Sequence, residues 1–237
     1  MSLLSPLASA QLILDSTRTN CEVFQRQNIP MGGSTIVISN HRSFLDAPIL
    51  INALRRPVRI ACHHYMGQTP GLKQMIDALG CFPLDAPQQR QERFFQRARG
   101  FLEANEWVGL FPEGGSPMIH LTNPKEMTSF HRGFAHLALR CPLEKLAVLP
   151  VAILSEDESV ISPFPVRFLR LFDPTEPLFD QDAWHPVVIY HRVKVYIGRP
   201  YWITDAQRAN YSGKQGKRTV TEITDYCVRE ISTLLNR

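Results

Sequence analysis

Apolar residues along the chain fall into short continuous runs and into longer segments with helical spacing. Four continuous runs are typical of strands buried on both faces: STIVIS (34–39), PVRIAC (57–62), WVGLF (107–111) and LAVLPVAI (146–153). Two later runs predict further strands: VRFLRLF (166–172) and VVIYHRVKVYIG (187–198). Helical spacing and helix-ending Gly or Pro residues predict helices over 3–27, 47–54, 70–79, 88–104, 130–140 and 217–236.

Strands that alternate with helices predict an α/β fold, in which a mixed, partly parallel sheet is covered by helices on both faces. The 237 residues suit one domain that ends in a C-terminal helix. We expect residues 1–30 to form an N-terminal helix. This helix is either amphipathic and lies on a membrane, or it is packed against the main domain of residues 31–237.

The composition narrows the functional classes. Hydrophobic residues make up 44% of the chain, as in a globular core, yet the longest apolar runs are too short to cross a bilayer. The N-terminus lacks the pattern of a secretory signal, and the 5 cysteines form no C-x-x-C pair, so we expect a cytoplasmic protein with reduced thiols. The net charge of +4 comes from scattered residues, which predicts no nucleic-acid partner.

A histidine and an aspartate stand close together where the first strand ends, in SNHRSFLDAP (39–48). One interpretation makes Asp46 the N-cap of a helix that has Pro48 in its first turn. The other makes His41 a general base and Asp46 the carboxylate that orients it. On a continuous helix this spacing would turn the two side chains about 140° apart. The pair therefore requires His41 in the turn and Asp46 in the first helical turn.

No protein nucleophile accompanies the histidine, because the chain has no G-x-S-x-G motif and no cysteine with an obvious base. A His-Asp pair of this kind suits a reaction in which a hydroxyl of the substrate attacks. A second polar stretch, GLFPEGGSP (109–117), follows the third strand. Glu113 is either exposed in an ordinary turn or anchors the close approach of the backbone to a ligand. Because ligands bind at the carboxyl ends of parallel strands, we expect His41 and Glu113 at one sheet edge.

Four stretches resemble, in order, the sequence blocks of the glycerolipid acyltransferases, the 1-acylglycerol-3-phosphate or PlsC-type group. NHRSFLD (40–46) is similar to the N-H-x-x-x-x-D block of that family. The other blocks resemble PGLKQMIDALGCFPLD (70–85), FPEG (111–114) and VLPVAI (148–153). Two further stretches also look like family features: FHRGFAHLAL (130–139) and VKVYIGRPY (193–201). The resemblance implies that residues 31–237 form an acyltransferase domain.

The resemblance implies that a fatty acyl group moves from an acyl-thioester to a hydroxyl of a glycerolipid-type acceptor such as a lysophospholipid. The donor would be acyl-CoA or an acyl-carrier protein, and no cofactor is expected. His41 would deprotonate the hydroxyl and Asp46 would hold the imidazole, while Glu113 and Gly114 would bind the acceptor. The alternatives are a thioesterase or lipid hydrolase that uses the same pair, and a non-catalytic lipid-binding module.

Two positions depart from that family's pattern. Ala86 and Ser116 stand where the family usually has arginines that bind the acceptor phosphate. The basic residues that could replace them are Arg90, Arg93, Lys125 and Arg132. We therefore expect an acceptor that is neutral, zwitterionic or otherwise not a phosphate monoester.

Two further expectations concern metals and location. The adjacent His63 and His64 would point to opposite faces of a strand, so we expect no metal site. An amphipathic N-terminus and the positive net charge would favour peripheral association with a membrane surface. In a cytoplasmic protein, this surface would be the cytoplasmic face of the membrane.

Overall fold

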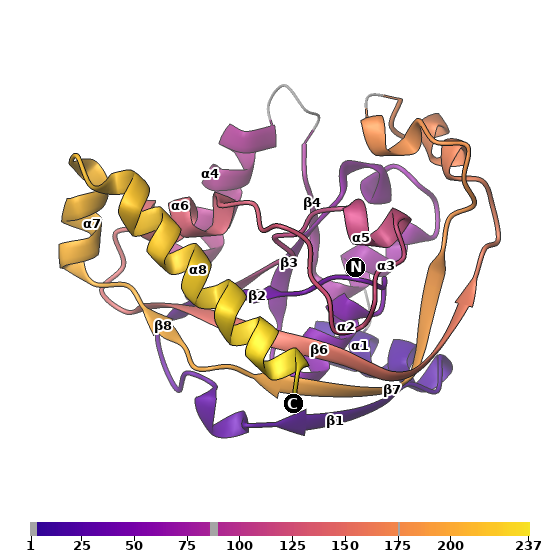
Figure 1. Cartoon of the computed structure of the whole chain (residues 1–237), viewed down its shortest axis with the longest axis horizontal. Coiled ribbons are helices and arrows are strands. Elements are labelled where there is room, and N and C mark those ends of the chain that lie inside the picture. Colours follow the sequence, from indigo (N-terminus) through magenta and orange to yellow (C-terminus); the bar gives the residue numbers. More distant parts are fainter. Residues whose placement is uncertain (1–3, 86–89, 175) are drawn as a thin grey trace.

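In the described part of the chain, 8 strands form a mixed sheet at the centre of the protein (Figure 1). The computed structural model describes residues 4–85, 90–174 and 176–237. The strands are β1 (Asn20–Phe24), β2 (Ser34–Ser39), β3 (Val58–Cys62), β4 (Phe82–Pro83), β5 (Trp107–Leu110), β6 (Leu146–Ile161), β7 (Val187–Ile197) and β8 (Tyr201–Trp202). Their order across the sheet is β1-β7-β6-β2-β5-β3-β4, and β8 pairs with β6.

Most neighbouring strands run parallel. β2 is parallel to β5 and β6, β3 is parallel to β4 and β5, and β1 is parallel to β7. β6 is antiparallel to β7 and β8. The carboxyl ends of β2, β3 and β5 therefore meet at one sheet edge, where ligands bind in open α/β sheets. The predicted mixed, partly parallel sheet is confirmed.

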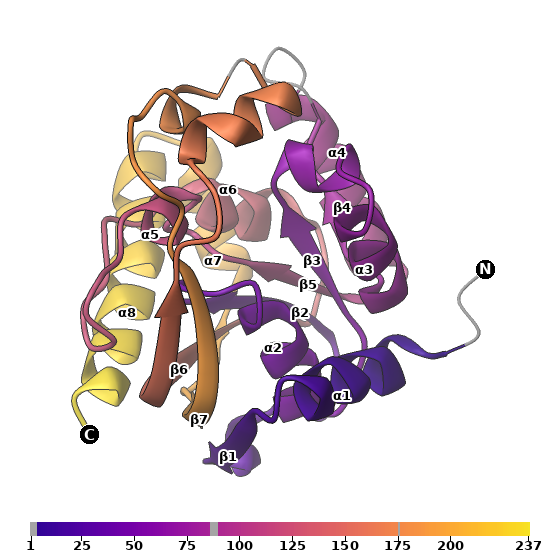
Figure 2. The same ribbon diagram turned by 90° about the vertical axis from the view of Figure 1, so that its right-hand side faces the viewer.

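Helices cover both faces of this sheet, as predicted (Figure 2). The α-helices are α1 (Pro6–Ser16), α2 (Asp46–Leu54), α3 (Leu72–Leu79), α4 (Arg90–Glu103), α5 (Ser116–Ile119), α6 (Gly133–Arg140), α7 (Asp205–Ser212) and α8 (Gly216–Leu235). Short 3-10 helices are η1 (Arg26–Asn28), η2 (His64–Gly67), η3 (Val166–Leu171) and η4 (Pro177–Phe179). α1 and α2 pack on one face of the sheet, and α4, α6 and α8 pack on the other.

β6 and β7 continue beyond β2 as a two-stranded ribbon that carries a surface segment. β6 pairs with β2 as far as Val151 and with β7 as far as Ile161. The residues between the two strands, 162–174 and 176–186, are named the cap, which lies at the top of Figure 2. The strand predicted over 166–172 is wrong, since Val166–Leu171 forms η3. The ladder already ends where Ile161 pairs with Val187, so these residues lie outside the sheet.

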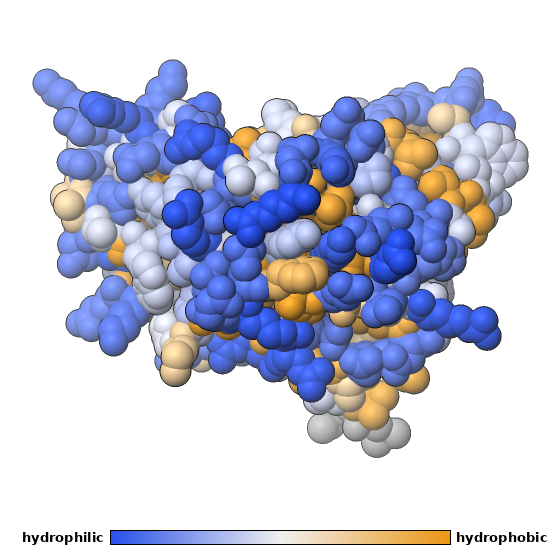
Figure 3. All heavy atoms as spheres, turned by 60° about the horizontal axis from the view of Figure 1, so that its bottom comes forward, coloured by the Kyte–Doolittle hydropathy of each residue, from blue (hydrophilic) through white to orange (hydrophobic). Residues whose placement is uncertain are grey.

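The surface is mostly hydrophilic on the side that Figure 3 brings forward, where hydrophobic residues form separate patches. Large apolar side chains of the cap are exposed to solvent, among them Leu171 (72% exposed) and Trp184 (60% exposed). None of the described helices combines the length and the apolar character that crossing a bilayer requires.

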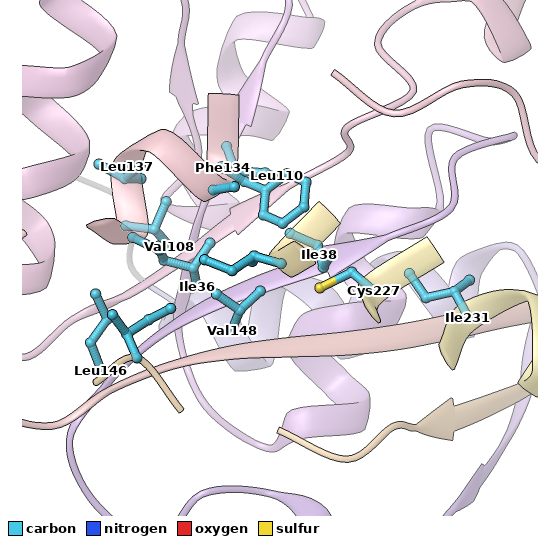
Figure 4. Close-up of a cluster of buried hydrophobic side chains, with 14 of the residues drawn as sticks. Ile36, Ile38, Val108, Leu110, Phe134, Leu137, Leu146, Val148, Cys227 and Ile231 are labelled. Atoms are coloured by element: carbon cyan, nitrogen blue, oxygen red, sulfur yellow. The ribbon is translucent and has the colours of Figure 1, made fainter. Parts of the chain in front are cut away.

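The central strands are buried because their apolar side chains point to both faces. Ile38 of β2 belongs to the core on the side of α6 and α8, whereas Val37 belongs to the core on the side of α1 and α2. Figure 4 shows Ile38 next to Cys227 of α8. On β5, Gly109 lets β3 pack closely, because a Cβ atom there would lie 2.6 Å from Cγ1 of Ile60.

The N-terminal segment differs from the single helix predicted over 3–27. α1 is shorter, and Asn20–Phe24 forms β1, which pairs in parallel with β7. The chain turns at Arg18, whose φ is 55°, and pairing with β7 outweighs the local helical pattern. Ala10 and Leu14 of α1 are buried in the core with residues of α2, so this side of the helix is a packing surface.

Candidate active site

His41 and Asp46 form a hydrogen-bonded pair just beyond the end of β2. Atom Nδ1 of His41 lies 2.8 Å from Oδ2 of Asp46, whose side chain is only 1% exposed. The same Oδ2 accepts hydrogen bonds from the backbone N–H groups of Arg42 (2.8 Å) and Ser43 (2.9 Å). One carboxylate oxygen therefore holds both the loop backbone and the imidazole ring.

The position of Asp46 argues against the capping interpretation. α2 begins at Asp46 itself, its N-cap residue is Leu45, and no side chain caps it. Asp46 stands in the first turn of the helix, and its carboxylate binds the loop that precedes the helix. This is the arrangement that a His-Asp pair with this spacing requires.

The imidazole of His41 lies flat against Phe111. The two ring centroids are 4.1 Å apart, and the ring planes differ by 9°. Because Nδ1 faces Asp46, Nε2 is the ring nitrogen that is left to accept a proton. The side chain of His41 is 18% exposed and lines a cavity, so a substrate in this cavity can reach the ring.

Glu113, which follows β5, supports the loop that carries His41. This loop, residues 40–45 between β2 and α2, is named the His41 loop. Oε1 of Glu113 accepts a hydrogen bond of 3.0 Å from the backbone N–H of His41, and its Oε2 accepts hydrogen bonds from the N–H and hydroxyl groups of Thr128. Burial raises the pKa of the Glu113 carboxyl group, while the hydrogen bonds from Thr128 and His41 act in the opposite direction. Glu113 is not among the described residues that line the cavity beside His41, and its contact with an acceptor stays a prediction. Gly114, by contrast, lines the cavity.

Asn40 and Arg42 tie the same loop to β6. The N-H-x-x-x-x-D block contains Asn40 without giving it a role, and Arg42 stands at one of the unspecified positions of that block. Asn40 donates from Nδ2 to the carbonyl of Ile153 (2.8 Å) and accepts from its N–H (2.9 Å). Arg42 forms a two-pronged ion pair with Glu158, with N···O distances of 2.8 and 2.9 Å. These partners lie 113 and 116 positions away along the chain. No local sequence signal could therefore have identified these contacts.

Tyr190 of β7 is a buried neighbour of the pair. Burial raises its pKa well above the usual value, and the charge of Asp46 acts in the same direction. The phenol therefore keeps its proton and adds no second negative charge beside Asp46.

A cavity of about 1110 Å³ opens beside His41. Its walls are mainly apolar and come from β3, α3, α4 and the cap, including Ile60, Met75, Phe94 and Phe168. Among the described residues that line it there is no lysine and no arginine. These walls suit a hydrocarbon chain, and they offer no permanent positive charge to an anionic headgroup.

Three of the residues predicted as phosphate contacts have described side chains, and none of the three lines this cavity. Arg93 and Lys125 are exposed. Arg132 precedes α6 and lines a second, smaller cavity. The side chain of Arg90 and residue Ala86 lie outside the described part of the chain.

His63 and His64 follow β3 and have different partners. Nε2 of His63 lies 2.8 Å from Oε2 of Glu176, and its Nδ1 lies 3.9 Å from Oδ2 of Asp173. The Nδ1 atom of His64 instead lies 3.0 Å from the carbonyl oxygen of Leu84. His63, Asp173 and Glu176 each offer a ligand atom, all within 4.8 Å of one another, so they could hold a metal ion. That the protein has no metal site stays a prediction.

Comparisons with known proteins identify the family and support the fold. A family model described as Acyltransferase matches residues 20–154, more than half of the chain. The chain belongs to the acyltransferase family. The fold of this acyltransferase is similar to the crystal structure of the 1-acyl-sn-glycerophosphate (LPA) acyltransferase PlsC from Thermotoga maritima, with a TM-score of 0.57 and 18% sequence identity. The match covers 98% of this chain and 79% of that chain. No curated protein sequence matches the acyltransferase significantly.

Proposed function

We propose that this acyltransferase moves a fatty acyl group from an acyl-thioester to a hydroxyl of a glycerolipid-type acceptor such as a lysophospholipid. The observation that carries the proposal is the 2.8 Å pair of His41 and Asp46 at the wall of an apolar cavity. The pair supplies a base, and the cavity has room for the hydrocarbon chain of a lipid. The similar fold of PlsC, which is named for an acylglycerophosphate, supports the choice of a glycerolipid.

In the proposed reaction, Nε2 of His41 takes the proton of the acceptor hydroxyl while the hydroxyl oxygen attacks the thioester carbonyl carbon. Asp46 keeps the other proton on Nδ1 and stabilises the imidazolium that forms. The tetrahedral intermediate collapses when its C–S bond breaks. The imidazolium then gives its proton to the departing sulfur, which leaves as a free thiol. The acyl transfer therefore needs no further reactant.

The acceptor in this proposal lacks a phosphate monoester. A monoester carries close to two negative charges and binds best to arginine side chains. The described walls of the cavity contain neither arginine nor lysine, so a neutral or zwitterionic headgroup fits better. We assign Gly114 to the acceptor contact and Glu113 to the positioning of the His41 loop.

Mass spectrometry of the products tests the reaction. The protein is mixed with a long-chain acyl-CoA or acyl-carrier protein and with several hydroxyl acceptors. An acylated acceptor that the His41→Ala variant does not form supports the proposed transfer. Free fatty acid without an acylated acceptor would reveal a hydrolase, and binding without turnover would reveal a lipid-binding module.

Comparison of two acceptors tests the headgroup. We expect kcat/KM for lysophosphatidylcholine to be at least equal to kcat/KM for lysophosphatidic acid with the same acyl donor. A preference for lysophosphatidic acid above about tenfold, or about 1.4 kcal/mol of transition-state binding, would contradict the proposed headgroup.

We also propose that the protein associates peripherally with a membrane through the cap. Leu171, Trp184 and Phe168 of the cap are 72%, 60% and 51% exposed. Phe168 also lines the large cavity, so this exposed apolar surface continues into a cavity of lipid size. Apolar and aromatic side chains of this kind insert favourably at the membrane–water boundary. The cytoplasmic face of the membrane stays a prediction.

A further inference from the structure

A second cavity, of about 480 Å³, lies among residues of α6, α7 and α8. Three cationic side chains line it: Arg132, Lys214 and Lys217. All three are exposed to solvent. Among the described residues that line the cavity there is no aspartate and no glutamate. A group with several negative oxygens would therefore meet positive charge here without a competing carboxylate.

The surroundings of this cavity add to its positive character. His136 also lines the cavity, and its pKa is lowered by burial and by the charges of Arg140 and Arg132. Tyr211 joins these groups, because its hydroxyl lies 3.1 Å from Nδ1 of His136 and accepts a hydrogen bond of 2.7 Å from Nε of Arg140. The arginines therefore create a positive potential that an anion would relieve.

The second cavity borders the large cavity beside His41. His131 and Gly133 line the large cavity, whereas Arg132 between them lines the small one. The backbone N–H of His131 donates a hydrogen bond of 2.8 Å to the carbonyl of Pro112, in the loop that also supports His41. The chain at the start of α6 therefore separates a cationic cavity from the cavity in which acyl transfer would occur.

We propose that the second cavity binds the phosphate of the acyl donor's phosphopantetheine arm, as found in CoA and on acyl-carrier proteins. The proposal rests on the acyl transfer proposed above. In a lysophosphatidate acceptor only a few bonds separate the phosphate from the reacting hydroxyl, so both would occupy the cavity beside His41. In the donor, a long flexible arm separates the phosphate from the thioester. Cations placed outside the large cavity therefore suit the donor and not the acceptor.

Kinetics of a Lys214→Ala/Lys217→Ala variant test the site with two thioesters that share one acyl chain. Acyl-4′-phosphopantetheine carries the phosphate and acyl-pantetheine lacks it, and the two thioesters do not differ otherwise. We expect the preference for acyl-4′-phosphopantetheine, measured as the ratio of the two kcat/KM values, to fall about tenfold. The control Lys73→Ala/Lys145→Ala removes the same charge at exposed positions that do not line either cavity. It should keep the preference of the natural protein.

Calorimetry without turnover separates this proposal from the proposed reaction. CoA and a holo-acyl-carrier protein are the probes, since both carry the phosphate, and the probe whose affinity falls identifies the donor. We expect the Kd of at least one probe to rise about tenfold in the Lys214→Ala/Lys217→Ala variant. Unchanged affinity for both probes would overturn the proposal. A loss confined to kinetics with phosphate-bearing acceptors would also overturn it, because the site would then belong to the acceptor.

Discussion

Glu113 accepts a hydrogen bond of 3.0 Å from the backbone N–H of His41, although the two residues are 72 positions apart in the chain. The second carboxylate oxygen of Glu113 is held by Thr128. The loop that carries the proposed base is therefore fastened to the end of β5 by a buried side chain. This contact explains how two distant sequence blocks act on one imidazole.

The Glu113→Gln variant separates positioning from acceptor binding. The amide has one oxygen fewer to accept the bonds from His41 and Thr128, so we expect the His41 loop to lose its fixed position. The expected result is a kcat at least about tenfold lower with little change in the acceptor KM. Steady-state kinetics at varied acceptor concentration measure both constants. A raised KM with kcat unchanged would instead assign Glu113 to the acceptor.

The His41→Ala and Asp46→Asn variants test the base and its partner. We expect His41→Ala to lower kcat by about 10²- to 10⁴-fold, the usual contribution of a general base. Its melting temperature should change little, because Asp46 keeps the backbone donors of Arg42 and Ser43. Asp46→Asn should cost less activity, since the amide oxygen can still orient the ring but the charge is lost. Unfolding of Asp46→Asn without a specific loss of rate would point to a purely structural role.

The Gly109→Ala variant tests the close packing of β3 on β5. The new methyl group would lie 2.6 Å from Cγ1 of Ile60 and 3.0 Å from Cγ1 of Val58. We expect a loss of about 1–3 kcal/mol in the free energy of unfolding, measured by urea denaturation. Gly100→Ala is the matched control, because no neighbouring atom lies within 4 Å of its Cβ position in α4. A stability of Gly109→Ala equal to that of this control would contradict the packing argument.

The stability of the protein should fall as the solution becomes acidic, in part because of His185. Burial lowers the pKa of this side chain, which is 6% exposed. The unfolded chain therefore binds the proton at a higher pH, near the usual value of about 6.5. Stability contributed by neutral His185 is present above that pH and declines as the pH falls toward the lowered value.

Melting temperatures of His185→Gln between about pH 7 and about pH 5 check this dependence. We expect a shallower decline than in the natural protein, with some slope left because the pKa of His136 is lowered as well. The exposed His120 provides the control variant His120→Gln, which should keep the full slope. An unchanged slope in His185→Gln would remove this residue from the explanation.

The cap can be tested as a membrane-binding surface with the Leu171→Ser/Trp184→Ser variant. We expect its sedimentation with neutral phosphatidylcholine vesicles to weaken several-fold, because the lost apolar area no longer inserts. Leu12→Ser/Trp202→Ser replaces side chains that are 58% and 45% exposed on α1 and β8. This control should bind vesicles normally. Equal binding by the two variants would contradict a specific role of the cap.

The central sheet could be predicted because a strand that is buried on both faces has apolar residues at successive positions in the sequence. Val37 and Ile38 face opposite sides of β2 and both are buried, so the strand appears as a continuous apolar run. The relation of His41 to Asp46 was also accessible, since a loop followed by one helical turn brings these positions together. Local geometry was sufficient in both cases.

Features that depend on distant partners could not be predicted in this way. β1 forms because Asn20–Phe24 pairs with β7, although the segment continues a helical pattern. The role of Glu113 depends on burial beside Thr128, and Arg42 depends on Glu158 at the far end of β6. Each partner is set by the tertiary fold, and the polar residues involved resemble ordinary loop or surface residues in the sequence.

The ribbon of β6 and β7 separates the cap from the contacts that hold the proposed base. Asn40 and Arg42 bind the ribbon at Ile153 and Glu158, before the cap begins. The cap can therefore be exchanged or lengthened while these anchors keep the His41 loop in place. A protein with this layout can acquire a new preference for lipid surfaces without rebuilding the machinery that moves the proton.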